Sequence, residues 1–358
     1  MTMIKWFLLA ALSAAIAVPF TRPVIAGEFV DVLDSPSLPS PIAEQSTLTG
    51  LTLAGKRLVS VGQRGHILYS DDQGQHWQQA HVPVSSDLVA VNFPSADQGW
   101  AVGHDGVVLH SSDAGQTWTR QLDGRQVGPI LLEHYQELLA QKPDDEKLQS
   151  RLTEAQRMVE EGADKPFLDV WFESAQVGYI VGAFNLILRT DDGGQRWTPL
   201  LDRTENPSAL NLYAIRPVGD DLFVVGEQGL VMKLDRPSGR FNAMPTPYNG
   251  SFFGITGKPG VVLVYGLRGN VWRSTDSGAN WARIDLGLPL NITAASVTAD
   301  GRIVLVSQAG HVLVSSDDGA SFQTRAPATL APVAAAQITT GDVLVLAGTR
   351  GLRQLPLE

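Results

Sequence analysis

Carboxylates recur at one fixed place in this chain, inside polar turns of the form Ser/Thr-x-Asp-x-Gly-x-x-Trp/Phe. Two facing carboxylates could hydrolyse a glycosidic bond, and a cluster of them could hold calcium. The spacing favours a structural use, because Asp and Ser side chains bond turn amides and Gly accepts a positive φ. The five turns are Ser70-Asp72-Gly74-Trp77, Ser111-Asp113-Gly115-Trp118, Thr190-Asp192-Gly194-Trp197, Ser274-Asp276-Gly278-Trp281 and Ser315-Asp317-Gly319-Phe322.

Acid–base catalysis has few other candidates. Asp169 and Glu173 lie near the start of a β-rich run and could face a central channel, but the sequence shows no partner for either. The five polar turns described above are Asp-boxes. Such turns also occur in sialidases, which need three converging arginines and a tyrosine beside a glutamate. The Arg-Ile-Pro element typical of sialidase starts is absent. We therefore predict no enzyme, and the alternative is a carbohydrate-binding protein or a glycoside hydrolase of the sialidase-like propeller type.

Metal and cofactor chemistry is not expected either. The paired aspartates at Asp71-Asp72 and Asp317-Asp318 lack the alternating oxygen ligands of a calcium loop. The chain has no cysteine, which excludes disulfides and thiolate sites. No ligand spacing connects the seven histidines, which are His66, His76, His81, His104, His110, His134 and His311. We predict no metal and no cofactor.

The Asp-box turns repeat at about 40 residues, a period typical of repeat architectures. One unit holds four short β-rich runs, at residues 88–93, 99–103, 107–110 and 117–120. Four antiparallel strands repeated radially form a propeller blade. The sequence therefore predicts an all-β, seven-bladed β-propeller over residues 27–358. Because the last unit offers only three strands, we expect Phe29–Leu33 to supply the fourth and close the ring.

Residues 124–165 interrupt the β pattern between the second and third blades. Leu131, Tyr135 and Leu138 fall at helical spacing, and so do Leu148 and Leu152. The segment is predicted to be a helical hairpin, on the face opposite the Asp-boxes. It either docks a partner, as insertions on repeat scaffolds often do, or only decorates the propeller rim.

The same face carries the turn of a repeated Val-Gly-x-x-Gly element. Arg64, Arg268 and Arg350 occupy this turn, and the third repeat is aligned with Phe184-Asn185 at its variable positions. A basic spot on a chain of net charge −10 is a candidate docking point for carboxylates. The alternative is that these arginines are solvated turn residues. The candidate partner-binding residues are Arg64, Arg268, Arg350, Tyr135 and Leu138.

The N-terminal segment predicts export. Lys5 precedes an apolar run from Trp6 to Phe20, and Val24-Ile25-Ala26 precedes Gly27. This pattern is typical of a signal peptide at residues 1–26, with an uncleaved anchor as the alternative. The mature chain is expected to have no membrane span and to be periplasmic, or in the thylakoid lumen of a photosynthetic host. The acidic balance opposes nucleic acid as a partner.

The tandem order Val-Gly-x-x-Gly-x-Ile/Val-Leu-x-Ser-x-Asp-x-Gly-x-x-Trp resembles the photosystem II stability/assembly factor family and its bacterial relatives. Val61–Ser70 and Val102–Ser111 carry the resemblance. It implies an exported, non-enzymatic, seven-bladed scaffold that binds an integral membrane protein on its lumenal or periplasmic side. Such a scaffold would help a membrane complex to assemble, stay stable or be regulated. In a non-photosynthetic bacterium, the resemblance implies that the complex could be a membrane exporter.

Overall fold

The computed structural model describes residues 30–325 and 330–357. The predicted signal peptide, residues 1–26, lies outside the described residues. Within the described part of the chain, no helix is long and apolar enough to cross a membrane. All the elements below belong to one structural unit that starts at Asp31.

Seven antiparallel sheets follow one another along the chain, each built from consecutive strands. The first contains β1 (Leu48–Ala54), β2 (Arg57–Gly62), β3 (Ile67–Ser70) and β4 (Gln78–Gln79). The second contains β5 (Leu88–Asn92), β6 (Gly99–Gly103), β7 (Val108–Ser111) and β8 (Thr119–Leu122). The third contains β9 (Phe167–Phe172), β10 (Gly178–Gly182), β11 (Ile187–Thr190) and β12 (Thr198–Pro199).

The remaining four sheets repeat this order. The fourth contains β13 (Leu212–Val218), β14 (Asp221–Gly226), β15 (Val231–Asp235) and β16 (Arg240–Ala243). The fifth contains β17 (Phe252–Lys258), β18 (Val261–Gly266), β19 (Val271–Ser274) and β20 (Ala282–Ile284). The sixth contains β21 (Ile292–Val297), β22 (Ile303–Ser307), β23 (Val312–Ser315) and β24 (Gln323–Arg325). The seventh contains β25 (Val333–Ile338), β26 (Val343–Gly348) and β27 (Gly351–Pro356).

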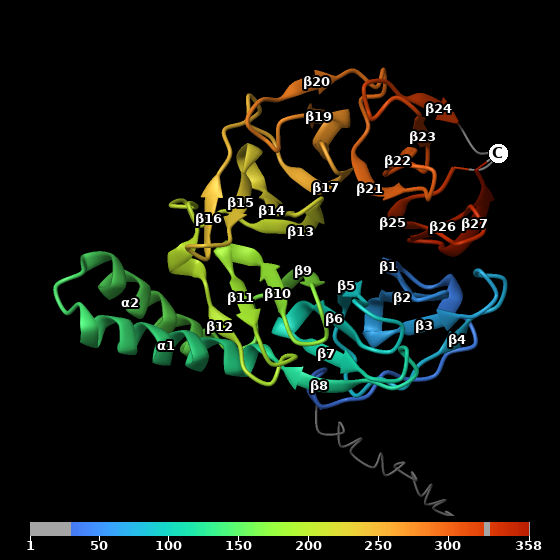
Figure 1. Cartoon of the computed structure of the whole chain (residues 1–358). Coiled ribbons are helices and arrows are strands. Elements are labelled where there is room, and N and C mark those ends of the chain that lie inside the picture. The colour runs from blue at the N-terminus through green and yellow to red at the C-terminus, as the bar shows by residue number, and fades with distance from the viewer. Residues whose placement is uncertain (1–29, 326–329, 358) are drawn as a thin grey trace, which may run out of the picture. The chain divides into compact units, whose positions relative to one another are not determined.

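The first strand of each sheet packs against the first strand of the next, and β25 packs against β1 (Figure 1). The sheets therefore form a closed ring, and the predicted seven-bladed β-propeller is confirmed. The second strands read as nearly continuous apolar runs, such as Leu58–Gly62 and Gly178–Gly182, and every residue of these two runs is buried. A strand covered on both faces by neighbouring sheets needs this composition.

The predicted closing strand at Phe29–Leu33 is wrong. Phe29 lies outside the described residues, and Val32–Asp34 form a turn beside the second sheet. The amide of Ser85 donates to the carbonyl of Val32 at 2.8 Å, and the side chain of Leu33 is buried in the core of the first two sheets. Burial of Leu33 holds this segment there, so the seventh sheet has three strands within the described residues.

Side-chain packing closes the ring instead. Leu48 and Leu68 of the first sheet share a buried cluster with Ala347 of the seventh sheet. Ala43, in the short helix η1 (Ala43–Gln45), completes this cluster, and η1 also contacts β27.

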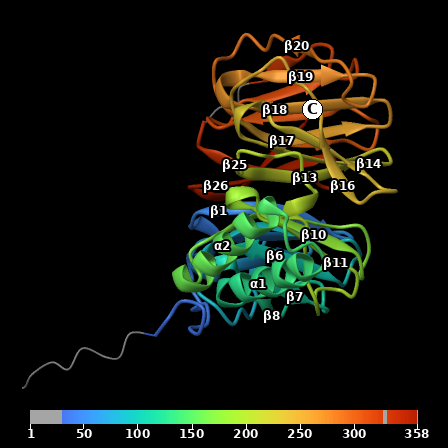
Figure 2. The same ribbon diagram turned by 90° about the vertical axis from the view of Figure 1, so that its left-hand side faces the viewer.

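The predicted helical hairpin between the second and third blades is confirmed. It consists of α1 (Gly124–Gln141) and α2 (Glu146–Glu161), on the side of the propeller that Figure 2 presents to the viewer. Asp123 and Gln126 form a capping box at the start of α1, and Asp145 caps α2. The helices approach closely at Gly128, because a Cβ there would lie 2.8 Å from the amide nitrogen of Val159.

We expect Trp100→Ala to lower the free energy of unfolding by about 3–5 kcal/mol. Trp100 is 1% exposed and stacks on Phe172 of the third sheet with ring centroids 3.6 Å apart. Its indole N–H also donates to Gln121 at 2.9 Å. Urea unfolding measures the loss, and Trp100→Phe, which keeps the stack, is the control. A loss as small as that of the control would show that this interface is not held by the stacked ring.

Candidate functional site

The Asp-box carboxylates are engaged in hydrogen bonds within their own turns. In the second box, Ser111 Oγ donates to Asp113 Oδ1 at 2.8 Å and accepts from the Gly115 amide at 2.9 Å. Asp113 Oδ1 also accepts from the Thr117 amide at 2.9 Å, and the indole N–H of Trp118 donates to the Gly115 carbonyl at 3.0 Å. Each carboxylate therefore fixes the connection between the third and fourth strands and is not presented to a substrate.

Hydrogen bonds lower the pKa values of the box carboxyls. The side chain of Asn280 makes the largest contribution at Asp276, and that of Ser321 at Asp317, and the pKa of each carboxyl falls to about 2. A carboxyl that is ionised and fully engaged at neutral pH is a poor general acid. These aspartates are structural residues.

Asp169 and Glu173 do not form a catalytic pair. Asp169 is 3% exposed and accepts a hydrogen bond from the Ile215 amide at 2.8 Å and a second from the guanidinium of Arg216. Burial raises the pKa of its carboxyl, and Arg216 opposes that rise. Glu173 pairs with Arg236 at 2.9 Å. Both carboxylates thus join the third blade to arginines of the fourth blade, partners that the sequence did not reveal.

The described residues contain no group of three or more histidine, aspartate or glutamate side chains placed to hold a metal ion. Two of the histidines have equivalent local roles. His66 Nδ1 lies 3.1 Å from Ser46 Oγ, and His311 Nδ1 lies 3.1 Å from Ser307 Oγ. The ring of His66 thus contacts the N-terminal arm, residues 31–46, and that of His311 contacts its own blade.

The turns between second and third strands gather on one face of the ring, which we call the turn face. They include η2 (Gln63–Gly65), η3 (His104–Gly106), η4 (Ala183–Asn185), η6 (Glu227–Gly229) and η7 (Leu267–Gly269). Each of these five contacts the first strand of the following sheet. The hairpin starts on this face, as predicted, because a Cβ at Gly106 would lie 2.7 Å from Gly124.

The turn of the third blade, η4, aligns with the other turns one residue earlier than the sequence predicted, so that its variable pair is Ala183-Phe184. Phe184 has φ 54 and stands where Arg64 (φ 57) and Arg268 (φ 55) stand in their blades. Asn185 occupies the place of the glycine, and its amide is buried and bonded to Thr204 at 2.9 Å. Phe184 therefore takes the place that arginine has in the first and fifth blades, and its side chain is 58% exposed there.

Arg64, Arg268 and Arg350 are exposed on the turn face. Within the described residues none of the three forms an ion pair, in contrast to Arg57, Arg125, Arg216 and Arg236. Their role as partner-binding residues stays a prediction. Their backbones are fixed, since the Arg64 amide donates to Asp87 at 2.8 Å and the Arg268 amide to Asn291 at 2.9 Å.

The hairpin residues named as contacts lie in or against a hydrophobic cluster that joins both helices to the second, third and fourth blades. Tyr135 is 1% exposed and Leu138 packs against the core shared by the second to fourth blades. Tyr135 is therefore not a surface contact, and that prediction is wrong, because the single apolar stripe of α1 is used to attach the hairpin. His134, paired with Asp202 at 3.3 Å, adds a polar tie to the third blade.

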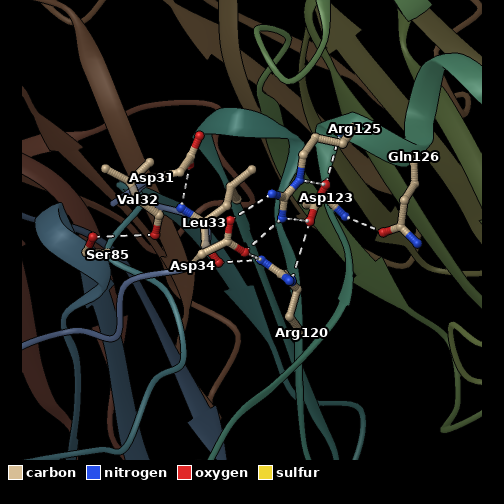
Figure 3. Close-up of polar contacts among 9 residues, drawn as sticks. All are labelled: Asp31, Val32, Leu33, Asp34, Ser85, Arg120, Asp123, Arg125 and Gln126. Carbon is tan, nitrogen blue, oxygen red and sulfur yellow. Dashed lines mark hydrogen bonds and ion pairs between the residues drawn. The ribbon is translucent and has the colours of Figure 1, made fainter. Parts of the chain in front are cut away.

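The N-terminal arm, residues 31–46, fixes the root of the hairpin (Figure 3). Asp34 accepts hydrogen bonds from Arg125 Nη1 at 2.8 Å and Arg120 Nη1 at 3.2 Å, and Arg125 also bonds Asp123 at 2.8 Å. The hydrogen bond from Arg125 is the main reason that the pKa of Asp34 falls to about 2. The first turn of α1 is thus tied to a segment about 90 residues earlier in the chain.

The ring and its boxes define a seven-bladed Asp-box propeller whose unpaired arginines lie on the turn face. A family model described as photosynthesis system II assembly factor YCF48 matches residues 54–131 and 148–240. A curated relative, photosystem II assembly lipoprotein Ycf48 of Synechococcus sp. (strain CC9902), is 34% identical over 159 residues. That alignment covers 44% of this chain and 35% of the relative, so it spans about a third of the relative's length. These matches confirm the resemblance to the photosystem II assembly factor-like family.

Solved structures show the same fold at low sequence identity. The structure of YCF48 bound to D1 peptide has a TM-score of 0.64 and 15% identity, over 90% of this chain and 96% of that chain. YCF48 from Cyanidioschyzon merolae gives 0.63 and 15%, over 89% and 97%. The WD40 propeller domain of Doa1 gives 0.61 and 9%, over 91% and 97%.

We expect Asp276, in the Asp-box of the fifth blade, to stabilise the protein at neutral pH and to lose this effect in acid. The folded pKa of Asp276 lies below that of an unfolded aspartate, about 3.9. Its contribution is therefore complete above about pH 4 and is lost as the pH falls toward 2. Asp276→Ala should melt several degrees below the wild type at pH 7, with a gap that closes between pH 4 and 2.

The matched control is Asp220→Ala, because Asp220 is exposed and its side chain makes no hydrogen bond within the described residues. The control should melt like the wild type at every pH. A gap for Asp276→Ala that persists unchanged at pH 2 would contradict the assignment.

Proposed function

We propose that this chain is an exported, non-catalytic scaffold that binds a segment of an integral membrane protein and helps its complex to assemble or stay stable. The observation that carries the proposal is the turn face, where three arginines without an ion pair to any described residue lie on a protein of net charge −10. Exposed and unpaired guanidinium groups can bind carboxylates of a partner without first breaking an internal ion pair.

The relatives support this proposal. The matched family is described as a photosystem II assembly factor, and a structure of the same fold was solved with YCF48 bound to D1 peptide. For this chain we infer a partner on the periplasmic side, or on the lumenal side in a photosynthetic host, after removal of residues 1–26. In a non-photosynthetic bacterium the partner complex would be an exporter. The carbohydrate alternative has no paired carboxylates to support it among the candidates described above.

The test is a pull-down from solubilised membranes with the purified protein. The combined variant Arg64→Ala, Arg268→Ala, Arg350→Ala should recover at least about tenfold less of the membrane protein that the wild type retains. The matched control is Arg196→Ala, Arg240→Ala, Arg283→Ala, which removes the same charge from exposed arginines away from the turn face.

Equal losses in the two triple variants would show that net charge, and not the turn face, governs binding. Failure of the wild type to retain a membrane protein would overturn the proposal, and glycan binding would then be tested. Thermal melts of all three proteins separate lost binding from lost folding.

A further inference from the structure

One residue in each blade is left out of the ladder between the first and second strands. At this β-bulge the register skips the second residue of β1, β5, β9, β13, β17, β21 and β25. A bulge re-aims the side chain of the residue that it leaves unpaired. All seven side chains are partly exposed, in the order Thr49, Val89, Leu168, Tyr213, Phe253, Thr293 and Ala334.

These seven side chains are not equal in size. Blades three to five carry large ones, at Leu168, Tyr213 and Phe253. Blades six, seven, one and two carry smaller ones, at Thr293, Ala334, Thr49 and Val89. A hollow of about 370 Å³ lies on the small side, and Phe253 forms one of its walls. We call it the channel-mouth hollow.

The lining of this hollow is mostly apolar. The hydroxyl of Thr49 is engaged with the Leu88 carbonyl at 2.6 Å, and that of Thr293 with the Val333 carbonyl at 2.8 Å. The ring of Phe253 is held edge-on by Tyr213, with centroids 6.0 Å apart. Two of the four threonine hydroxyls in the lining are therefore engaged, and with the ring of Phe253 these walls suit an apolar group better than a sugar.

The turns that carry Arg64, Arg350 and Arg268 are each linked to residues that line the hollow, through a hydrogen bond or as neighbours in the chain. The Gln63 amide, next to Arg64, donates to the Thr47 carbonyl at 3.1 Å, and Thr47 lines the hollow. Thr349 lines it and directly precedes Arg350.

The third connection runs through two side chains. Arg268 donates its amide to Asn291 Oδ1 at 2.9 Å, and Asn291 Nδ2 donates to the lining residue Gln308 at 2.9 Å. The hollow thus lies among the unpaired arginines of the first, fifth and seventh blades.

We propose that the channel-mouth hollow binds one large apolar side chain of an extended peptide, with the acidic residues beside it bound by Arg64, Arg268 and Arg350. This inference rests on the proposed function and names the part of the partner that the turn face selects. Charge complementarity argues for the acidic neighbours, and the engaged hydroxyls argue for an apolar anchor. A pocket of this size is at the small end for ligand sites, which matches a single side chain.

The test uses four synthetic peptides, acetyl-Gly-Glu-X-Glu-Gly-amide, with X as Ala, Val, Leu or Phe. Isothermal titration calorimetry on the purified protein should give at least about tenfold tighter binding for Leu or Phe than for Ala. Ala334→Leu, which fills the hollow, should abolish this preference. Leu168→Phe enlarges the equivalent position in the third blade, which lies across the ring from the seventh, and should leave the preference intact.

The wild-type peptide series needs no variant, so it remains decisive if Ala334→Leu does not fold. Equal affinity for all four peptides would overturn the hollow as an anchor site, while retention of a membrane partner in the pull-down would still support the scaffold. Tight binding of methyl glucoside that Ala334→Leu abolishes would also overturn it, in favour of the carbohydrate alternative. A preference that survives in Ala334→Leu would place the anchor elsewhere.

Discussion

Packing between neighbouring blades is the constraint on which this structure depends. The second strand of each sheet is apolar on both faces, so no blade can bury its surface alone. The stack of Trp100 on Phe172 shows how closely two blades meet. Since every sheet needs two neighbours, the ring must close, and closure fixes the positions of the turns at both of its faces.

Closure without a shared strand has a further consequence. Because the seventh blade packs on the first through side chains, the N-terminal arm is left to bind elsewhere. It buries Leu33 beside the second sheet and offers Asp34 to Arg120 and Arg125 at the start of α1. The arm thus positions the hairpin, which in turn uses Tyr135 to attach itself to the propeller core.

The charged residues fall into two groups, those engaged in internal hydrogen bonds or ion pairs and those exposed without an ionic partner among the described residues. Aspartates of the Asp-boxes are engaged in turn hydrogen bonds, and Asp169 and Glu173 are paired with arginines of the next blade. The turn face is different, because Arg64, Arg268 and Arg350 have no ionic partner among the described residues. This contrast is the basis of the proposed recognition of an acidic segment, and the uneven channel mouth is the proposed source of its selectivity.

The sequence by itself determined the blade repeat, the number of blades, the hairpin and the structural use of the Asp-boxes. These follow from local patterns, namely β-rich runs, turn residues at fixed spacing and helical periodicity. It misplaced Phe29–Leu33, Tyr135 and the alignment of Phe184. Only the tertiary structure decided those positions, along with the pairing of Asp34 and the hollow beside Ala334. Each depends on contacts between residues far apart in the chain, and such contacts are set by which surfaces meet when the ring closes.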